Sequence, residues 1–579
     1  MPPESNGYAT WDPLYAVINR CGLSSCADFL EIEPQNEILF ENFWNEKADV
    51  DAMVFGCYAR MQDDDVLSRM LVWGEFRSDN LTFGVNIENN GDLNNIMLEN
   101  LRESNGYATW DPLYAVINRC NTVIKFAPMV AERDLSFSEG ELKATIAEMS
   151  ALRDLCYFYL IRTFRDVPYS TVAYTDDDQK FDLPATPFYD VLDSLICDLE
   201  SVKGDAVVKY PEDKENYQTG RITQEAIYAM LCEMYLWKKD YANCIRYADL
   251  VIESKKKQEE ERIEKLSGTK VEAEEYLMGY PLIPTGSTSG DRIYGNAYTS
   301  IFGDGNSREG IFELTFDKLN ANMPANGVFE SMYGSSNGGG LVAPPIFIAE
   351  DISNKTYKVF DSKLDARFYE NIGLDGPVVR KGVAESAYID ASNPDNVQNE
   401  DGNNLYPQKQ NRCNFILYRL TDIMLLKAEA LVQSMSDASA DSLSADNEAL
   451  RRQAFTLVNV VNKRSLCQLT LKDTLLYNDY GTKAQMEELV LLERQRELMF
   501  EGKRWFDLVR DAMRTNSTRT LLKNVLQKYT SNTSIIQNKL LKMDAIFWPI
   551  HEDELKVNKS LKQNPIYAAG DNESYEKNY

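Results

Sequence analysis

The chain has 579 residues, and 90 Asp and Glu against 61 Lys and Arg give it a formal net charge of -29 at pH 7. So acidic a surface repels phosphate backbones and anionic lipid headgroups, which excludes nucleic acid and a basic membrane patch as expected partners. The single histidine, His551, does not suffice for a multi-histidine metal site or a histidine acid/base pair, and we expect no catalytic residue, metal or cofactor.

The amino-terminal region contains a repeated segment. Residues 4–21 recur unchanged at 103–120, with unrelated sequence on either side. A structural repeat would diverge and recur at a fixed period, so we interpret the first copy as an artefact that displaced a native start. Residues 1–25 are therefore set apart from the fold as artefactual or processed.

The residues that follow have the form of a bacterial lipoprotein processing box. An apolar residue and two small ones precede the cysteine that would be lipidated, Cys26. The basic and apolar stretches that normally precede such a box are missing here. No stretch of the chain approaches 18 uninterrupted apolar residues, so no membrane-spanning helix is expected.

Amphipathic helices are predicted from residue 139 onward. Residues 139–165 carry apolar side chains at helical spacing, and residues 222–237 and 241–253 form a predicted pair of helices. Within this pair, the pattern Tyr-x2-Leu-Cys-x2-Tyr at 228–235, with a small residue at Cys244, is typical of a tetratricopeptide hairpin. Small residues at such positions let two helices approach closely.

Three cysteines follow the same periodicity. Cys156, Cys232 and Cys244 fall among Leu, Met, Ile and Ala at helical spacing. We interpret them as small buried apolar residues rather than as disulfide partners.

The amino-acid composition changes after residue 254. Residues 255–275 are highly charged and predict a solvated helix or a mobile excursion. Residues 279–415 are rich in Gly, Asn, Ser, Pro and Tyr, with a short strand predicted at 310–316. A long loop-rich segment between helical regions is where binding function tends to lie.

Helices are predicted again at 420–433, 447–465 and 486–513. In the last, Glu501 with Arg504 and Asp507 with Arg510 have the spacing of ion pairs along a helix. Glu493, Glu497 and Glu501 share one helix face and could form a catalytic carboxylate cluster. Since each has a nearby arginine, an ion-pair network is the favoured interpretation.

Five stretches in this order resemble the SusD/RagB family, the surface lipoproteins of Bacteroidetes nutrient-uptake systems. They are CADFLEIEP at 26–34 with ENFWNEKAD and GCY up to Tyr58, WGEFRSDN at 73–80, WDPLYAVINRCN at 110–121, ALRDLCYFYL with FRDVP at 151–168, and ERQRELMFEGKRWFDL at 493–508 with WPIHEDEL and QNPIY up to Tyr567. The family commonly has proline where His551 stands.

The resemblance implies an all-α fold with about four tetratricopeptide-like helical pairs and an irregular, loop-rich subdomain that carries the ligand face. It implies a helical region at 26–278, a ligand-face insertion at 279–415 and a second helical region at 416–579. It further implies lipidation at Cys26, a place on the outer face of the outer membrane, and a role without catalysis. The partner would be a SusC-like TonB-dependent transporter, and the ligand a glycan or, in some members, a peptide.

Ligand candidates are aromatic rings that stack on sugar faces and polar groups that bond hydroxyls. The aromatic candidates in the loop-rich segment are Tyr294, Tyr298, Phe302 and Tyr333, and the polar candidates are Arg77, Asp79, Asn80 and Asn86. For both sets the alternative is a packing role: the rings would fill the loop-rich subdomain, and the polar residues would form a buried network. Trp110 and Trp505 belong to helix motifs and are expected to pack.

Two other classes of function remain as alternatives. An intracellular tetratricopeptide scaffold predicts a regular 34-residue period, which the insertion at 279–415 interrupts. A glycoside hydrolase would need a pair of carboxylates, and among 90 acidic residues only measured turnover would support one.

Overall fold

The computed structural model describes residues 43–85, 87–175, 179–268, 277–285, 295–317, 324–335, 338–349, 359–360, 365–372, 378–385, 409–436, 445–466 and 475–568. Residues 1–25, Cys26, Asn86 and Tyr294 therefore lie outside the described residues.

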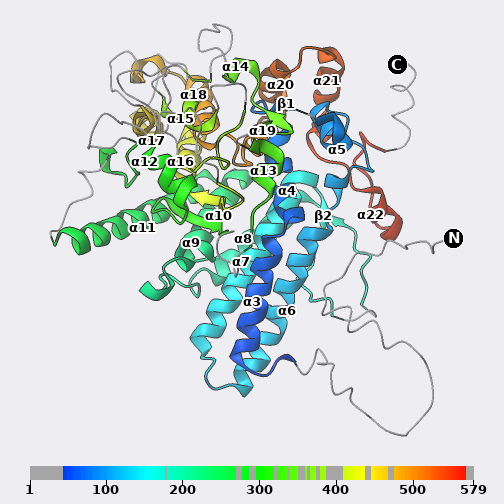
Figure 1. Ribbon diagram of the computed structural model, residues 1–579, viewed down its shortest axis with the longest axis vertical. Coiled ribbons are helices and arrows are strands. Elements are labelled where there is room, and N and C mark those ends of the chain that lie inside the picture. The colour runs from blue at the N-terminus through cyan, green and yellow to red at the C-terminus, as the bar shows by residue number, and fades with distance from the viewer. Residues whose placement is uncertain are drawn as a thin grey trace.

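The first helices form an elongated bundle at the lower end of the molecule in Figure 1. The long α6 packs against both α3 and α7. The helix α7 begins where the sequence predicts it, because Ser138 and Glu141 form a capping box with the backbone at its start. The bounds are α3 (Lys47–Met61), α4 (Asp64–Leu71), the π-helical turn η1 (Val72–Phe76), α6 (Asp111–Arg133) and α7 (Glu139–Phe164).

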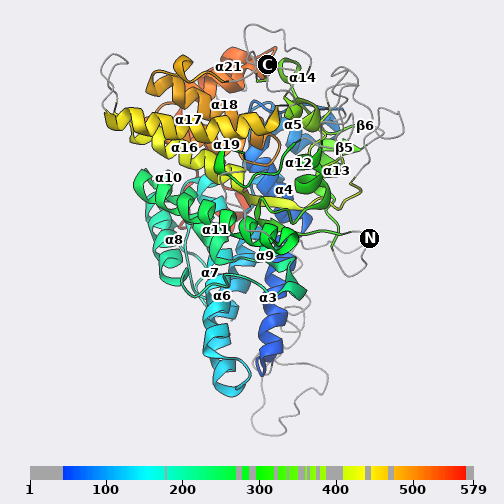
Figure 2. The same cartoon turned by 90° about the vertical axis from the view of Figure 1, so that its left-hand side faces the viewer.

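The next helices stack in succession, and α16 to α18 lie above α10 and α11 in Figure 2. The helix α10 packs against α8 and α11, α11 against α16, and α16 against α17 and α18. The predicted all-α, tetratricopeptide-like fold is confirmed. These helices are α8 (Phe188–Val202), α10 (Gln224–Lys238), α11 (Tyr241–Ser267), α16 (Leu420–Ser434), α17 (Ala445–Ser465) and α18 (Lys483–Leu498).

The α10–α11 hairpin confirms the tetratricopeptide pattern of small residues. The Sγ atoms of Cys232 and Cys244 lie 3.7 Å apart, both fully buried. The turn between the helices places Lys239 in the left-handed region (φ 67°), and the Asp240 side chain caps α11. These two cysteines and Cys156 are free buried thiols, as predicted.

Short elements complete the description. The remaining helices are α5 (Gly91–Met97), α9 (Tyr217–Gly220), α12 (Asn296–Tyr298), α13 (Val328–Tyr333), α14 (Ile346–Ala349), α15 (Ala366–Asn371), α19 (Arg504–Thr515), α20 (Arg519–Val525), α21 (Thr533–Leu540) and α22 (Glu552–Val557). Single turns are η2 (Ile87–Asn89), η3 (Gly106–Ala108), η4 (Glu212–Lys214), η6 (Leu277–Gly279), η7 (Thr299–Asp304), η9 (Tyr477–Asp479), η10 (Leu526–Lys528) and η11 (Met543–Ile546).

The strands are short and pair antiparallel in two-stranded sheets. The predicted strand at 310–316 is confirmed as β4 (Gly310–Leu314), which pairs with β8 (Phe415–Arg419) directly before α16. The other pairs are β1 (Thr82–Phe83) with β7 (Val342–Ala343), β2 (Val167–Pro168) with β3 (Ala185–Thr186), and β5 (Gly334–Ser335) with β6 (Gly338–Gly339).

Two helix predictions need correction. The single helix predicted at 486–513 is two helices, α18 and α19, because Phe500 and Gly502 adopt left-handed conformations (φ 68° and 72°) between them. The charged segment after residue 254 continues α11, but it is not wholly solvated. Lys255 and Glu259 are buried there, and Lys255 pairs with Glu225 at 2.9 Å.

The core is built largely from aromatic and aliphatic side chains of the helices. Trp44, Trp73, Trp505 and Trp548 are among its largest fully buried members, and Trp110 is also buried, so the packing role predicted for Trp110 and Trp505 is confirmed. No helix in the described part of the chain is long and apolar enough to cross a membrane.

Candidate functional site

The polar candidate Arg77 lies in the interior, directly after η1. Its side chain is fully buried and forms an ion pair with Glu99 (Nη2–Oε2 2.7 Å). The guanidinium also donates to the carbonyls of Ala545 and Ile546 and lies 4.2 Å from the centre of the Trp505 ring. Through its contacts with Ala545, Ile546 and Trp505, Arg77 holds the carboxy-terminal segment against the amino-terminal helices.

Asp79 and Asn80 belong to a second buried group. Arg504 donates two hydrogen bonds to the Asp79 carboxylate, at 2.8 and 2.9 Å. Gln495 donates to both Asp79 and Asn80 at 2.9 Å, and Asn80 donates to Glu75. Arg77, Asp79 and Asn80 have no exposed surface, so a ligand could reach them only if the surrounding packing changed. Their contact with a ligand stays a prediction.

The break between α18 and α19 forms around Glu75. Its carboxylate accepts from the backbone N–H groups of Phe500 (3.0 Å) and Lys503 (3.2 Å). Burial raises the pKa of Glu75 to about 7, although these hydrogen bonds and the one from Asn80 oppose the rise. This carboxylate therefore satisfies the backbone groups that the broken helix leaves unpaired.

The aromatic candidates of the loop-rich segment point inward. The Tyr298 hydroxyl donates to the carbonyls of Arg380 (3.0 Å) or Ala384 (3.1 Å), and the Tyr333 hydroxyl donates to the carbonyl of Phe500 (3.1 Å). Phe302 lies under the Lys381 ammonium, 4.9 Å from its ring centre. All three rings are buried, which fits the packing alternative, and their contact with a ligand stays a prediction.

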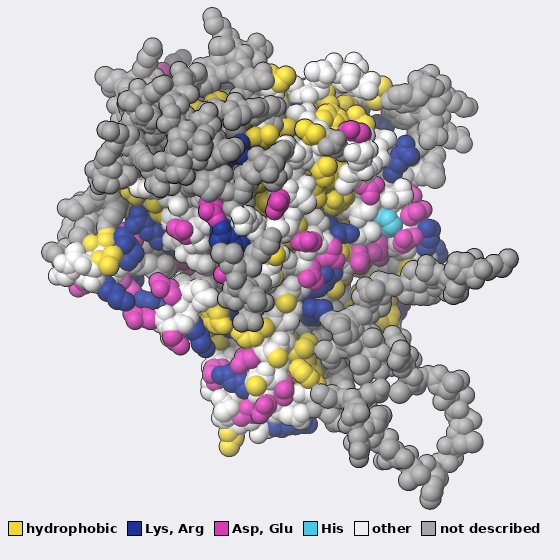
Figure 3. All heavy atoms as spheres, in the orientation of Figure 1, with side chains coloured by type: hydrophobic (Ala, Val, Ile, Leu, Met, Phe, Trp, Pro, Cys, Tyr) yellow, Lys and Arg dark blue, Asp and Glu magenta, His cyan; other side chains and the backbone are white. Residues whose placement is uncertain are grey.

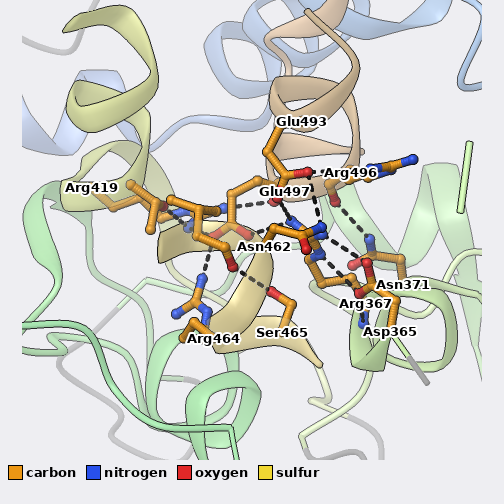
Figure 4. A network of polar contacts seen from close by, with 12 residues as sticks. Asp365, Arg367, Asn371, Arg419, Asn462, Arg464, Ser465, Glu493, Arg496 and Glu497 are labelled. Atoms are coloured by element: carbon orange, nitrogen blue, oxygen red, sulfur yellow. Dashed lines mark hydrogen bonds and ion pairs between the residues drawn. The ribbon is translucent and has the colours of Figure 1, made fainter. Parts of the chain in front are cut away.

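A buried charge network joins the loop-rich segment to α18 (Figure 4). Glu497 lies at its centre and pairs with Arg419 (2.6 Å), Arg367 (3.1 Å) and Arg464. Burial opposes ionisation of Glu497, but the Arg464, Arg419 and Arg367 guanidiniums outweigh it and hold its pKa well below the usual range. Glu501 pairs in turn with Arg419 (2.7 Å) and Lys381 (2.6 Å).

The network fits the ion-pair interpretation of the three carboxylates on α18 and directly after it. Glu493, Glu497 and Glu501 each contact a cationic side chain, as the ion-pair interpretation predicts. Arg496 pairs with Glu493 within α18 at 3.4 Å, while Arg367, Lys381, Arg419 and Arg464 come from distant elements. The predicted pair of Asp507 with Arg510 forms at 2.8 Å. The predicted Glu501–Arg504 pairing is wrong: Arg504 binds Asp79 instead, since the break after α18 turns the two residues apart.

Two small cavities adjoin this network. One has a volume of about 20 Å³ and is lined by Tyr298, Phe302, Glu370, Lys381 and neighbouring residues. The other, beside Phe302 and Phe329, measures about 10 Å³. Each has room for roughly one water molecule, so neither can hold a sugar ring. Burial raises the pKa of Glu370, in the first cavity, to about 7.

Exposed apolar side chains lie on and next to β1 and on α14. We call the exposed side chains of Phe83, Val85 and Ile346, with the half-buried Leu341 and Phe347, the β1–α14 surface. Phe83 is the last residue of β1, and Val85 lies two residues beyond it. Figure 3 shows hydrophobic side chains gathered in this part of the molecule. The sequence reasoning missed these residues, although it named the adjacent Asn86.

Polar side chains border this surface. Glu88 and Asn89 of η2 are exposed directly after β1. The backbone is fixed here, since Gly84 and Val85 donate to the carbonyls of Leu341 and Gly340, both at 2.9 Å. An exposed ring and apolar side chains beside amide and carboxylate groups can stack on a sugar face and bond its hydroxyls.

The described residues do not form a metal site. Among the described residues, no group of three or more His, Cys, Asp and Glu side chains is placed to hold a metal ion. His551 caps α22 by accepting a hydrogen bond from the Asp553 backbone N–H at 3.2 Å.

Two family models match the chain, one in each half. The model of the SusD family matches residues 308–567, and a model described as "Starch-binding associating with outer membrane" matches residues 28–236. SusD-like protein P38 of Formosa agariphila is 26% identical over 559 residues, covering 94% of this chain and 96% of that protein. SusD-like protein P2 of the same organism is 23% identical over 499 residues, covering 84% and 88%.

Solved structures share the fold. A SusD superfamily protein from Bacteroides thetaiotaomicron superposes with a TM-score of 0.62 at 20% identity, covering 90% of this chain and 99% of that one. A SusD superfamily protein from Bacteroides vulgatus gives a TM-score of 0.60 at 17% identity, with the same coverage.

Proposed function

Because this chain belongs to the SusD/RagB family, we propose that it is a non-enzymatic, cell-surface binding protein that captures an oligosaccharide and delivers it to a SusC-like TonB-dependent transporter. The observation that carries the proposal is the order of the two family matches, 28–236 and then 308–567, which together span most of the chain. The loop-rich segment, to which the resemblance assigns the ligand face, begins between the two matches and continues into the second.

The β1–α14 surface is the proposed ligand-contact region. Phe83 offers a ring that is 37% exposed, and Val85 and Ile346 extend the apolar area. Glu88 and Asn89 lie at its edge as hydrogen-bonding groups. Arg77, Asp79 and Asn80 precede β1 in the chain and fix the segment before it, because Asp79 and Asn80 bond to α18 and α19 while Arg77 bonds to η11.

Lipidation at Cys26 and a place on the outer face of the outer membrane belong to the same proposal. If Cys26 carries the lipid, Cys26→Ser expressed behind a lipoprotein export signal should leave the outer-membrane fraction and appear in the soluble fraction. Retention of Cys26→Ser in the membrane fraction would contradict the anchor while leaving the binding function open.

Two alternatives make different predictions. A peptide-binding member of the same family would release heat with peptides and none with glycans. An intracellular tetratricopeptide scaffold would bind folded protein partners through helical pairs that follow one another at a regular period in the chain. Here residues 279–415 separate α11 from α16 in the chain, although the two helices pack together.

The test is calorimetric titration of the full chain with a panel of neutral and acidic oligosaccharides and a panel of unstructured peptides. Heat with one glycan class supports the proposal, and heat with peptides alone supports the peptide-binding alternative. Absence of heat with every glycan, for the chain alone and for the chain with its SusC-like transporter, contradicts glycan capture.

A further inference from the structure

An aromatic cluster beside α9, which packs against β4, surrounds one arginine. The Arg221 guanidinium lies 5.5 Å from the ring centres of Phe55 and Tyr217 and 5.7 Å from that of Tyr210. The rings also contact one another: Tyr217 is 6.3 Å from Phe55 and 5.6 Å from Tyr210, centre to centre. Phe55 belongs to α3 and Tyr217 to α9, which lies close to α3 in Figures 1 and 2.

The cluster is held rigidly from behind. Glu148 of α7 accepts two hydrogen bonds from Arg221, from Nε at 2.8 Å and from Nη2 at 2.6 Å. Tyr58 donates to the same carboxylate at 2.6 Å. The short helix α9 is fixed through Thr219, whose hydroxyl donates to Asn306 at 2.7 Å. The rings are therefore positioned without a ligand, which lowers the entropic cost of binding one.

The loop before α9 is fixed by one side chain. Gln218 accepts from the Tyr210 N–H at 3.0 Å and donates to the Val208 carbonyl at 3.2 Å. This pair of bonds sets the position of Tyr210 beside Tyr217.

The front of the cluster is open to solvent. Phe55 is 47% exposed, and Tyr210, Tyr217 and Arg221 are half-buried. Phe55 does not serve the core, since the buried stripe of α3 runs through Val50, Val54, Cys57, Tyr58 and Met61. An exposed ring outside the packing stripe, next to two tyrosines, is the geometry that stacks on the apolar face of a sugar.

The charges around the cluster favour a neutral saccharide over an anionic one. The Arg221 charge is balanced by Glu148, and the neighbouring residues 212–215 are three exposed acids and one lysine. An anionic saccharide would meet net negative charge here, within a chain whose formal charge is -29. A neutral saccharide meets no such repulsion, and the tyrosine hydroxyls and the guanidinium can bond its hydroxyls.

We propose that Phe55, Tyr210, Tyr217 and Arg221 form a second, separate binding site for a neutral oligosaccharide, on the α3–α9 face. This inference rests on the proposed function and adds a site distinct from the β1–α14 surface. Two sites on one molecule would let it hold a polymeric glycan at two points and so raise its apparent affinity for long chains.

The test is calorimetry of the full chain with maltoheptaose, cellohexaose, xylohexaose and mannohexaose as neutral probes. Phe55→Ala and Tyr217→Ala should weaken binding at one of two sites by roughly tenfold or more, while Phe83→Ala weakens the other. The matched control is Phe181→Ala, which removes another exposed ring (54%) on the connection between α7 and α8 and should leave both sites unchanged.

Each outcome decides something. Binding that Phe55→Ala and Tyr217→Ala leave unchanged overturns the second site and leaves the proposed function standing. No heat with any of the four neutral probes overturns this site. Heat with oligogalacturonate or with a proline-rich peptide, lost in Phe55→Ala, overturns the ligand class. Thermal unfolding of each variant checks that the fold is intact, because a ring that served only to pin Arg221 would change the melting temperature and not the affinity.

Discussion

The Asp79 carboxylate receives two hydrogen bonds from Arg504 on α19, although the two residues are 425 positions apart in the chain. The distances are 2.8 and 2.9 Å, and both side chains are buried. The pair joins the segment after η1 to the first turn of α19, and with it the two parts of the chain that match family models.

We predict that Asp79→Ala destabilises the protein by about 3–5 kcal/mol, because it leaves the buried Arg504 charge without its partner. Denaturant-induced unfolding measures the change. The control is Glu139→Ala, which breaks an exposed pair with Lys143 on α7 and should leave the unfolding midpoint unchanged. If Asp79 instead serves to bind ligand, the variant would lose binding and keep its stability.

Gly74 gives a second prediction, at the closest approach of η1 to the α18–α19 break. A Cβ at this position would lie 1.9 Å from the carbonyl oxygen of Gly502, which is backbone and has a fixed position. We predict that Gly74→Ala costs several kcal/mol or prevents folding, measured by soluble yield and thermal unfolding. Gly140→Ala on α7 is the matched control, since nothing lies within 4 Å of its Cβ, and it should be neutral or slightly stabilising.

Glu370 predicts a pH dependence of stability. Burial raises its pKa to about 7, so its contribution to stability is fully present below the unfolded pKa of 4.5 and is lost as the pH rises through 7. We expect Glu370→Gln to match the wild type near pH 4.5 and to exceed it above pH 7, by at most about 3 kcal/mol. Chemical unfolding across pH 4.5 to 8 measures the difference. A constant offset between the two proteins at every pH would show that the carboxyl does not titrate in this range.

The β1–α14 surface predicts a separation of binding from stability. Phe83→Ala should weaken the binding of the captured oligosaccharide by roughly tenfold and leave the melting temperature nearly unchanged, because the ring is 37% exposed. Calorimetry and thermal unfolding of one preparation give both values. Leu135→Ala, at the exposed turn between α6 and α7, controls for loss of a surface apolar side chain. Equal affinity for Phe83→Ala and the wild type would place the ligand elsewhere.

The helical scaffold could be predicted from the sequence because local patterns determine it. The apolar period predicts α7, α10 and α17 to within a few residues, and the Ser138–Glu141 capping box fixes where α7 begins. The break after Leu498 could not be predicted, because the Glu75 carboxylate that holds it lies more than 400 residues away.

The ligand residues could be predicted less well than the fold. Tyr298 and Phe302 lie in a loop-rich segment, where the amino acids next to an exposed ring and next to a buried ring are of the same kinds. The sequence around them therefore does not show that both rings are buried. Phe55 did carry a signal in the sequence. It follows Val54 directly and so lies off the stripe that buries Val50, Val54 and Tyr58.

The pairing of Arg77 and Asp79 with the far end of the chain has a consequence for synthesis. Both residues leave the ribosome long before Ala545 and Arg504 exist. A nascent amino-terminal half would therefore have to bury the Asp79 charge without Arg504, and Arg77 without its carbonyl acceptors, or leave that part of its core open. Completion of the fold thus waits for the last helices. We therefore expect fragments cut between residues 236 and 308, where the two family matches separate, to be insoluble apart and to recover only when produced together.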